Sequence, residues 1–441
     1  MKWKKYPKYR DSGIEWLGDI PEGWEVRRFK YSLQYPLQYG ANESAEYDIP
    51  EWPRYVRITD IDDNGMLRKD TFRSLPKEVA EPYILKDGDL LLARSGATVG
   101  KTFLYKKSWG VAAFAGYLIR ASINKEQCLP AYAAYFCNSN AYWTWIRSSL
   151  IQATIQNVSA EKYGNLRIPF PDILQQTAIA AFLDRETARI DALIEKKERQ
   201  SELLQEKRAA LISHAVTKGL DPNAKMKDSG IEWLGDIPEG WEVKKLKFTS
   251  SYNDDSLKEN TDEDYELTYV DISSVGANVG IVKTESMLFA DAPSRARRKV
   301  QHGDTIISTV RTYLRAIASI INPEENLIVS TGFAVIRPKE ELISEFAGYA
   351  LRSIHFVEEV VARSVGVSYP AINASDLVNL VIPMPIKSQQ TAIAAFLDRE
   401  TARIDIMKSK VKDSIEKLIE YRTALISAAV TGKIDVRNEV A

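Results

Sequence analysis

The sequence predicts an α+β protein in which two globular domains are separated by an antiparallel pair of long, coiled-coil-like helices. Three observations support this fold class. Two sequence blocks occur twice, two long segments are rich in helix formers and lack Gly and Pro, and the intervening segments mix short β-rich runs with helical patches. Because both blocks recur in the same order, we expect a tandem duplication with approximate two-fold symmetry.

The duplicated blocks are identical letter for letter. Residues 11–26 recur as residues 228–243, 217 positions later, and residues 175–191 recur as residues 389–405, 214 positions later. Runs of sixteen and seventeen identical residues cannot arise by chance. The repeating unit is therefore about half of the chain.

The segments between the blocks have diverged. Residues 25–170 and 242–384 share only a scaffold, such as Gly88-Asp89 against Gly303-Asp304. Relaxed drift is the alternative explanation, but drift should have eroded the flanks too, so we interpret the pattern as one frame carrying two different surfaces. The β-rich runs and the helical patch expected in these α+β domains are residues 55–58, 89–93, 305–308 and 333–336, and residues 342–352.

Each long segment has the start and stop signals of a helix. Asp172 with Gln175 resembles a capping box and Gly219 follows the last helical residue, while Ser388 is the expected cap of the second helix and Gly432 its end. Each helix should have about 43 to 45 residues and a length of roughly 65 Å. The predicted segments are a first domain at 1–170, a first helix at 171–218, a second domain at 219–384 and a second helix at 385–433.

An apolar seam with seven-residue spacing runs along both helices, which indicates that each packs against a partner helix. The alternative is that each helix packs only on its own domain, but helices of this length exceed what a small domain can cover. Because the block that follows the first helix corresponds to residues near the N-terminus, the two chain termini should lie close together. The seam consists of Leu183, Ile190, Lys197, Leu204 and Leu211, and of Leu397, Ile404, Val411, Leu418 and Leu425.

Composition narrows the class of protein. The chain is 45% hydrophobic and 27% charged, which is typical of folded proteins, and it contains no apolar run long enough for a membrane span. Its basic N-terminus is not followed by an apolar stretch, so we expect no signal peptide. Cys128 and Cys137 lack partners for a zinc site and are expected to be reduced core thiols of a cytoplasmic protein.

No catalytic or metal-binding constellation stands out. The three histidines, His214, His302 and His355, lack the spacing of a metal-site or triad motif and are expected to be structural or exposed. Residues 96–102 resemble a phosphate-binding P-loop, but three residues rather than four separate the glycines, so nucleotide binding is not expected. A loop of this composition is better suited to a DNA backbone or to base edges.

Net charge is −1, so any positive charge used for nucleic acid must be sorted onto particular surfaces. The residue types that suit phosphates and base edges gather in several stretches. For any one of these residues a solvated surface is the better explanation, but the loops together are good candidates. The candidate DNA-binding residues are Arg54, Arg57, Arg94, Ser95, Thr98, Lys101, Gln152, Thr154, Gln156, Arg295, Arg297, Arg298, Arg311, Tyr313 and Arg315.

The duplicated blocks at 11 and 228 and at 175 and 389 closely resemble those of the specificity subunits of type I restriction-modification enzymes, over nearly the whole chain. The resemblance implies two target-recognition domains, each reading one half of a bipartite, asymmetric double-stranded DNA site, and helices that set the spacing between the halves. It implies two methyltransferase subunits that carry S-adenosylmethionine and methylate adenine, and restriction subunits that use ATP and Mg²⁺. It implies no catalytic residue or cofactor on this chain.

Charged residues repeated on both helices are candidates for docking the methyltransferase subunits, although a solvated helix face is an equal alternative. Two other functions stay open at this point: a self-sufficient DNA methyltransferase or nuclease, and an orphan DNA-binding or scaffold protein. The docking candidates are Arg185, Glu186 and Arg189, repeated as Arg399, Glu400 and Arg403.

Overall fold

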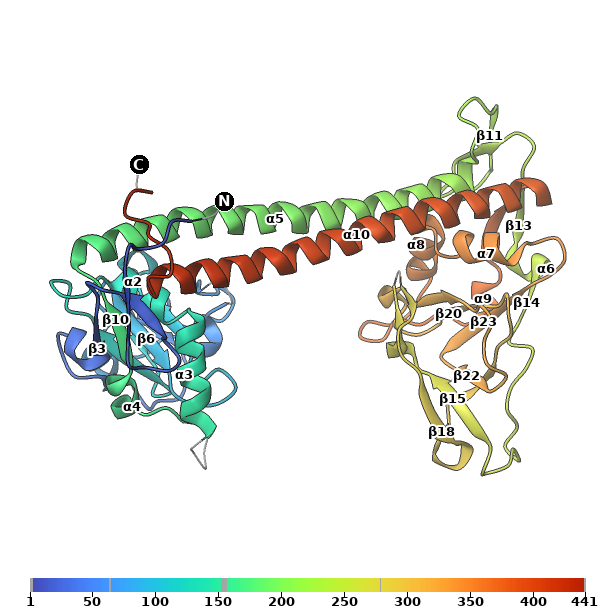
Figure 1. The fold of residues 1–441 in the computed structure, drawn as a ribbon. Helices are drawn as coiled ribbons and strands as arrows, with labels where there is room; N and C mark the ends of the chain where they lie inside the picture. Colours follow the sequence, from blue (N-terminus) through green and yellow to red (C-terminus); the bar gives the residue numbers. More distant parts are fainter. Residues whose placement is uncertain (1–2, 63–64, 152–156, 278, 440–441) are drawn as a thin grey trace. The chain divides into compact units, whose positions relative to one another are not determined.

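The computed structural model describes residues 3–62, 65–151, 157–277 and 279–439. The chain forms two compact units, and both long helices contribute to both of them (Figure 1). Unit 1 consists of Met1–Lys197 with Asp413–Ala441, and unit 2 of Glu198–Lys412. The units therefore cut across the four predicted segments. They confirm the predicted α+β class, because each combines antiparallel sheets with helices.

Unit 1 is built on a four-stranded sheet of order β4-β9-β6-β7, in which all neighbours are antiparallel. Three strand pairs flank it: β1 with β2, β3 with β10, and the parallel pair of β5 and β8. The strands are β1 (Tyr9–Asp11), β2 (Asp19–Pro21), β3 (Glu25–Arg28), β4 (Gln38–Tyr39), β5 (Arg54–Val56), β6 (Asp89–Ala93), β7 (Thr102–Leu104), β8 (Ala112–Phe114), β9 (Leu118–Ser122) and β10 (Arg167–Phe170). The helices are α1 (Lys77–Ala80), α2 (Pro130–Phe136), α3 (Asn140–Ile151), α4 (Ala160–Asn165), the first part of α5 (Ile173–Lys218) and the last part of α10 (Lys387–Val430).

Unit 2 repeats this frame around a four-stranded sheet of order β14-β23-β20-β21 and adds a second sheet of order β18-β15-β22-β19. Its strands are β11 (Met226–Asp228), β12 (Asp236–Pro238), β13 (Glu242–Lys245), β14 (Ser250–Tyr252), β15 (Glu266–Val270), β16 (Val275–Gly276), β17 (Gly280–Ile281), β18 (Glu285–Leu288), β19 (Ala296–Lys299), β20 (Thr305–Ser308), β21 (Ile317–Ser319), β22 (Leu327–Ser330), β23 (Phe333–Pro338) and β24 (Val381–Met384). Its helices are α6 (Leu246–Thr249), α7 (Ser344–Ala350), α8 (Ile354–Ala362) and α9 (Ala374–Leu377), with the remaining parts of α5 and α10.

The predicted secondary structure is largely confirmed. Strands occupy 89–93 and 305–308 as expected, and α7 lies within the predicted helical patch. The run at 55–58 is shorter than expected, because the Asp60 carboxylate accepts a hydrogen bond from the backbone N–H of Arg57 and folds Ile58–Asp60 into a 3₁₀ turn. Local capping thus ends this strand at Val56.

The two long helices begin and end largely where the sequence predicts. The backbone N–H of Gln175 donates to Asp172 Oδ1 at 2.8 Å, and Gly219 and Gly432 have the positive φ angles expected just beyond a helix. The expected cap at Ser388 is wrong. Helix α10 starts one residue earlier, at Lys387, and the backbone N–H groups of Gln389 and Gln390 donate to the carbonyl oxygen of Ile386.

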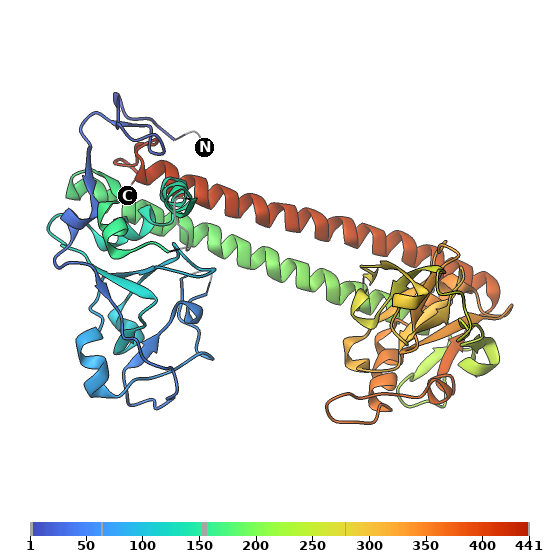
Figure 2. The same cartoon turned by 90° about the horizontal axis from the view of Figure 1, so that it is seen from below.

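Helices α5 and α10 lie side by side in an antiparallel pair (Figure 1, Figure 2). In unit 2 the Nζ of Lys408 donates to Gln205, and Arg208 Nε lies 3.4 Å from Asp405 Oδ1, so residues later in α5 meet residues earlier in α10. In unit 1 Arg422 contacts Asp191 through two hydrogen bonds of 2.8 and 3.3 Å. In each unit these pairs show that α5 and α10 run antiparallel. The predicted seam is buried at Leu183, Ile190, Leu397, Ile404, Val411 and Leu425 and half-buried at Lys197, Leu204, Leu211 and Leu418.

The same contacts hold each domain to the helices in both units. Tyr135 donates to Asp184 at 2.6 Å in unit 1, and Tyr349 donates to Asp398 at 2.7 Å in unit 2. The backbone N–H of Leu129 donates to Gln176, and that of Ile343 donates to Gln390, both at 2.8 Å. This repetition is the structural counterpart of the duplicated sequence.

The chain termini meet within unit 1, as predicted. The backbone N–H of Asp435 donates to the carbonyl oxygen of Lys4 at 2.8 Å, and the Tyr9 hydroxyl donates to the carbonyl oxygen of Gly432 at 3.0 Å. Lys433 donates to the carbonyl oxygen of Asp19, just as Lys218 donates to that of Asp236 in unit 2. The N-terminal hairpin therefore covers the end of α10 in the way that the β11–β12 hairpin covers the end of α5.

Candidate nucleic-acid interface

Each unit presents a loop between the last two strands of its main sheet, and a second segment lies beside that loop. In unit 2 the loop 309–316 joins β20 to β21, and the backbone N–H of Ile372 donates to the carbonyl oxygen of Thr309 at 2.9 Å. In unit 1 the loop 94–101 joins β6 to β7, and the N–H of Val158 donates to the carbonyl oxygen of Arg94 at 2.8 Å. We call these the hairpin loops. Because the two hairpin loops occupy equivalent positions, they are candidates for two binding surfaces of the same kind.

The hairpin loop of unit 2 is held in an uncommon backbone conformation. Arg311 and Arg315 have φ angles of 50° and 54°, in the left-handed region that non-glycine residues seldom occupy. Between them Thr312 is buried, and its hydroxyl lies 2.7 Å from the hydroxyl of Ser364 in the neighbouring segment. Strain of this kind costs of order 1–3 kcal/mol per residue and persists where surrounding contacts enforce it, commonly at functional sites.

The side chains of Arg311, Tyr313 and Arg315 on this loop are exposed. The Arg311 guanidinium lies 4.7 Å from the centroid of the Tyr369 ring, and Tyr313 is 51% exposed. Among the described residues, no hydrogen bond or ion pair engages the guanidinium groups of Arg311 and Arg315. Exposed cations without an acidic partner suit phosphate oxygens and guanine edges.

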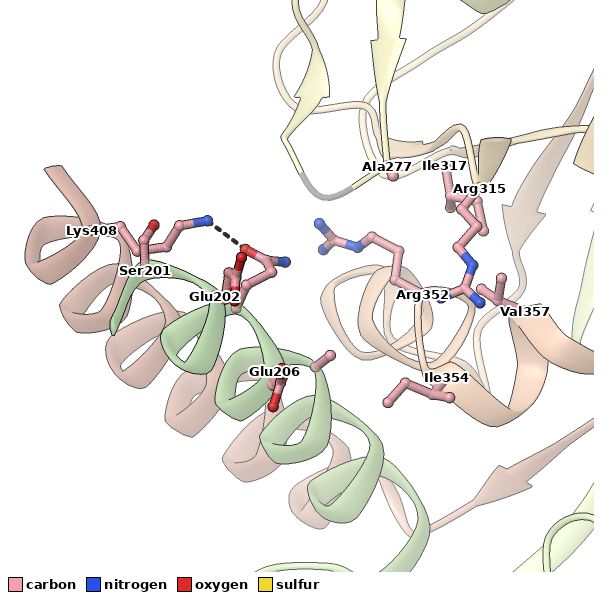
Figure 3. Close-up of a pocket in the computed structure, with 12 residues that line it drawn as sticks. Ser201, Glu202, Glu206, Ala277, Arg315, Ile317, Arg352, Ile354, Val357 and Lys408 are labelled. Atoms are coloured by element: carbon pink, nitrogen blue, oxygen red, sulfur yellow. Dashed lines mark hydrogen bonds between the residues drawn. The ribbon is translucent and has the colours of Figure 1, made fainter. Parts of the chain in front are cut away.

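Arg315 also borders a cavity of about 550 Å³ in unit 2, between the hairpin loop and the helix pair (Figure 3). Arg315 and Arg352 line it from the domain side, and Glu202 and Glu206 line it from α5. Cationic groups thus stand opposite acidic ones. We therefore regard Arg311 and Tyr313 as the outward-facing part of this loop.

Arg295 lies on the same edge of unit 2. The backbone N–H of Thr331 donates to the carbonyl oxygen of Arg295 at 2.8 Å. Gly332, which follows Thr331, accepts at its carbonyl oxygen a hydrogen bond from the backbone N–H of Thr309 in the hairpin loop. The Arg295 side chain is exposed. The other two arginines of this predicted cluster are engaged: Arg297 lies 4.6 Å from the Phe289 ring centroid, and burial lowers the pKa of Arg298, which contacts the carbonyl oxygen of Asn253.

The hairpin loop of unit 1 has different chemistry on the same frame. Arg94 is half-buried, with its guanidinium 4.7 Å from the Tyr39 ring centroid, and Ser95 forms a β-bridge with Asn157. Thr98 is half-buried and Lys101 is exposed. The candidates Gln152, Thr154 and Gln156 lie outside the described residues.

The loop's backbone does not form a P-loop. The N–H of Gly100 donates to Ala93, that of Lys101 to Thr98 and that of Val99 to Gly96, so these amides are used within the turn. The loop leads into strand β7, whereas a P-loop leads into a helix. Both observations support the expectation that this loop does not cradle nucleotide phosphates.

Arg54 and Arg57 have structural partners away from the hairpin loop. The Arg57 guanidinium donates to both oxygens of Asp60, a fully buried carboxylate, and to the carbonyl oxygen of Thr71. Arg54 donates to the carbonyl oxygen of Arg68, and burial lowers its pKa. Little of either guanidinium is left to read a base.

The docking candidates form the same ion-pair triad on both helices. Glu186 lies between Arg185 and Arg189, 3.3 and 3.4 Å from their nitrogens, and Glu400 lies 3.2 Å from each of Arg399 and Arg403. All four arginines are exposed. Hydrogen bonding to Arg399, and then to Arg403, lowers the pKa of Glu400. The two long helices therefore carry the same charged triad, once in unit 1 and once in unit 2.

Comparison with known proteins identifies the family. The family described as the type I restriction modification DNA specificity domain matches residues 46–203 and 238–417, which together cover more than half of the chain. The chain belongs to this family. Its two matched stretches correspond to the two halves of the duplication.

Relatives of this family member are similar along their whole length. The MjaVIII specificity subunit of Methanocaldococcus jannaschii is 26% identical over 428 residues, covering 95% of each chain. The EcoKI specificity subunit of Escherichia coli is 22% identical over 440 residues, covering 95% of this chain and 90% of that one. Because these relatives are specificity subunits, the prediction of a non-catalytic specificity subunit is confirmed.

Solved structures share the fold. A chain from a study of complex assembly and conformational transition of the type I R-M system superimposes with a TM-score of 0.69 at 18% identity, covering 93% of this chain and 98% of that one. The HsdS subunit from Thermoanaerobacter tengcongensis gives a TM-score of 0.53 at 17% identity, covering 94% of this chain and 98% of that one. Within the described residues, no group of His, Cys, Asp and Glu could hold a metal ion, and no helix could cross a membrane.

Two features of this specificity-domain chain escaped the sequence analysis. The helix pair carries the same ion pair twice, Arg208 with Asp405 and Arg422 with Asp191, and the equal spacing of Arg and Asp in both copies was an available signal. The second feature is the exposed apolar segment beside the hairpin loop of unit 2, which includes Tyr369. No periodicity in the sequence marks it.

Proposed function

We propose that this chain is the DNA-reading subunit of a type I restriction-modification enzyme and that each unit reads one half of a bipartite, asymmetric target in double-stranded DNA. The observation that carries the proposal is the contrast between the hairpin loops. The frame presents Arg311 and Tyr313 in unit 2, whereas the equivalent loop in unit 1 is a turn that contains Gly96 and Gly100. Equivalent positions with unlike chemistry suit two unlike half-sites.

The charge distribution supports local rather than general DNA binding. The net charge of −1 supplies no overall attraction to a polyanion, so affinity has to come from particular exposed cations. Arg295 and Arg311 are exposed arginines on the edge of unit 2, and neither has an acidic hydrogen-bonding partner among the residues described there. We expect this edge to contact the duplex.

We further propose that the helices fix the number of unread base pairs between the half-sites. Helix α5 has 46 residues and α10 has 44, and both contribute to both units. A continuous helix rises about 1.5 Å per residue, and half-sites one turn of DNA apart are separated by roughly 34–36 Å. A stiff connection permits one spacing, whereas a flexible linker would permit many.

The repeated triads support two docking sites for one kind of partner. We propose that two methyltransferase subunits bind the faces around Glu186 and Glu400, one on each. These subunits would carry S-adenosylmethionine, and restriction subunits would supply the chemistry that uses ATP and Mg²⁺. All of this would take place in the cytoplasm.

The experiment is to express the chain with the methyltransferase subunit of its host and to map methylated adenines across the genome. We expect one motif with two unlike halves and a constant spacer, and no methylation from the chain alone. Methylation or cleavage by the purified chain would support a self-sufficient enzyme instead. A chain that binds DNA but captures no methyltransferase would support an orphan DNA-binding or scaffold protein.

A further inference from the structure

The segment beside the hairpin loop of unit 2 forms a narrow, closed loop whose apolar side chains face solvent. Val365 and Ala371 exchange two backbone hydrogen bonds of 2.8 and 3.0 Å, which close the loop 366–370. At its tip Val367 is 102% exposed, and Val365 is 81% exposed. We call residues 365–371 the apolar tip.

The apolar tip is attached firmly to the hairpin loop. A β-bridge joins Ala371 to Val310, the N–H of Ile372 donates to Thr309, and the hydroxyls of Ser364 and Thr312 lie 2.7 Å apart. Tyr369 of the tip supports the Arg311 guanidinium. The tip and Arg311 are therefore presented together, in a conformation that needs little ordering when a ligand binds.

The exposed apolar side chains on these loops indicate a binding site. Five large apolar side chains, Tyr313, Leu314, Val365, Val367 and Tyr369, are each at least 42% exposed on these two adjacent loops. Clusters of this kind on a folded protein commonly mark interaction sites. The partner has to tolerate the free guanidinium of Arg311 at the same place.

The partner is better assigned to DNA than to a methyltransferase subunit. Two copies of one subunit would need the same surface on both units, but the stretch that corresponds to 365–371 in the first half of the chain is 151–157, and the two sequences are identical at no position. A stretch whose sequence differs between the two halves of the chain fits what has to differ, namely the half-site. In the major groove the apolar group on a base edge is the C5-methyl group of thymine.

We propose that Val367 contacts a thymine methyl group in the half-site read by unit 2, while Tyr369 positions Arg311 over an adjacent polar base edge or phosphate. This inference rests on the proposed function and adds to it a specificity-determining residue. Val367 is β-branched, so its χ1 angle has few allowed rotamers and its methyl groups lose little rotameric freedom when they make a contact. The contact depends on shape, so it should weaken when a methyl group is removed either from the base or from Val367.

The test uses the complex of this chain with its methyltransferase subunit and duplexes carrying the mapped target. Each thymine of both half-sites is replaced in turn by deoxyuridine, which lacks the C5-methyl group, and affinity is measured at one fixed salt concentration. We expect about a fourfold loss at one position of the half-site read by unit 2, the factor that corresponds to one buried methyl-sized group. Val367→Ala should cause a similar loss on thymine DNA and abolish the effect of deoxyuridine at that position.

The matched control is Val279→Ala, the same change at a side chain that is 77% exposed elsewhere in unit 2. It should leave both affinity and the deoxyuridine effect unchanged. The inference is overturned if no deoxyuridine position responds to Val367→Ala, or if Val367→Ala weakens capture of the methyltransferase subunit instead. The proposed function fails separately, at the earlier step, if the wild-type complex methylates no bipartite motif.

Discussion

Truncating a seam leucine should destabilise the unit that contains it. Leu397 of α10 is fully buried in unit 2, and its repeat equivalent, Leu183 of α5, is fully buried in unit 1. Leu→Ala substitutions in packed cores cost about 2–5 kcal/mol. For a unit of this size each kcal/mol lowers the midpoint temperature by about 2–4 °C, so we expect Leu397→Ala to lower the transition of unit 2 by about 4–20 °C.

Hydrogen exchange resolved by peptide is the appropriate assay, because it reports opening in each unit separately. Leu397→Ala should accelerate exchange mainly in peptides of unit 2, and Leu183→Ala mainly in peptides of unit 1. The controls are Ile406→Ala and Leu193→Ala, at helix positions that are 57% and 42% exposed, where less than about 0.5 kcal/mol should be lost. Equal acceleration in both units, or an effect no larger than that of the controls, would refute the packing described for the seam.

Three other predictions concern the chain termini, the glycines at the ends of the long helices, and a buried cysteine. A circular permutant whose original ends are joined by a short linker and whose new ends lie between residues 220 and 224 should keep wild-type stability in urea. The reason is that the two termini already lie together at the end of α10, as the continuous chain does at the end of α5. Loss of folding would contradict this. Gly432→Ala should be more destabilising than Gly219→Ala, since an added Cβ would lie 2.4 Å from the ring of Pro21 in the first case and 3.3 Å from its nearest neighbour in the second. Equal costs in urea unfolding would count against the close approach. Burial raises the pKa of Cys128 to about 12, so the folded thiol stays protonated at pH 8 and should react with a thiol reagent only after unfolding.

Features that repeat or that depend on neighbours in sequence were predictable. The seven-residue seam and the glycines that end both helices follow directly from spacing and composition. Ser388 was misassigned because the start of a helix depends on which carbonyl oxygen accepts hydrogen bonds from the first turn. Here the carbonyl oxygen of Ile386 accepts from the N–H groups of Gln389 and Gln390. A serine within the first turn looks the same in sequence as a cap.

The candidate interface depends on contacts between distant residues, so the sequence indicated it only in part. Arg57 looked available, but Asp60, three residues away, binds its guanidinium. Arg311 gains its position from Thr312 and from Ser364, which is about fifty residues further along the chain. Such long-range hydrogen bonds leave no local periodicity, and only the folded chain shows which arginines remain exposed.

The central claim is that two unlike readers on one duplicated frame each recognise one half of the target. The most direct test replaces residues 25–170 with the corresponding domain of a relative and maps methylated adenines in cells that also contain the methyltransferase subunit. We expect one half-site to change, while the other half-site and the spacer length stay as in the wild type. A motif in which both halves change, or in which neither does, would contradict the claim.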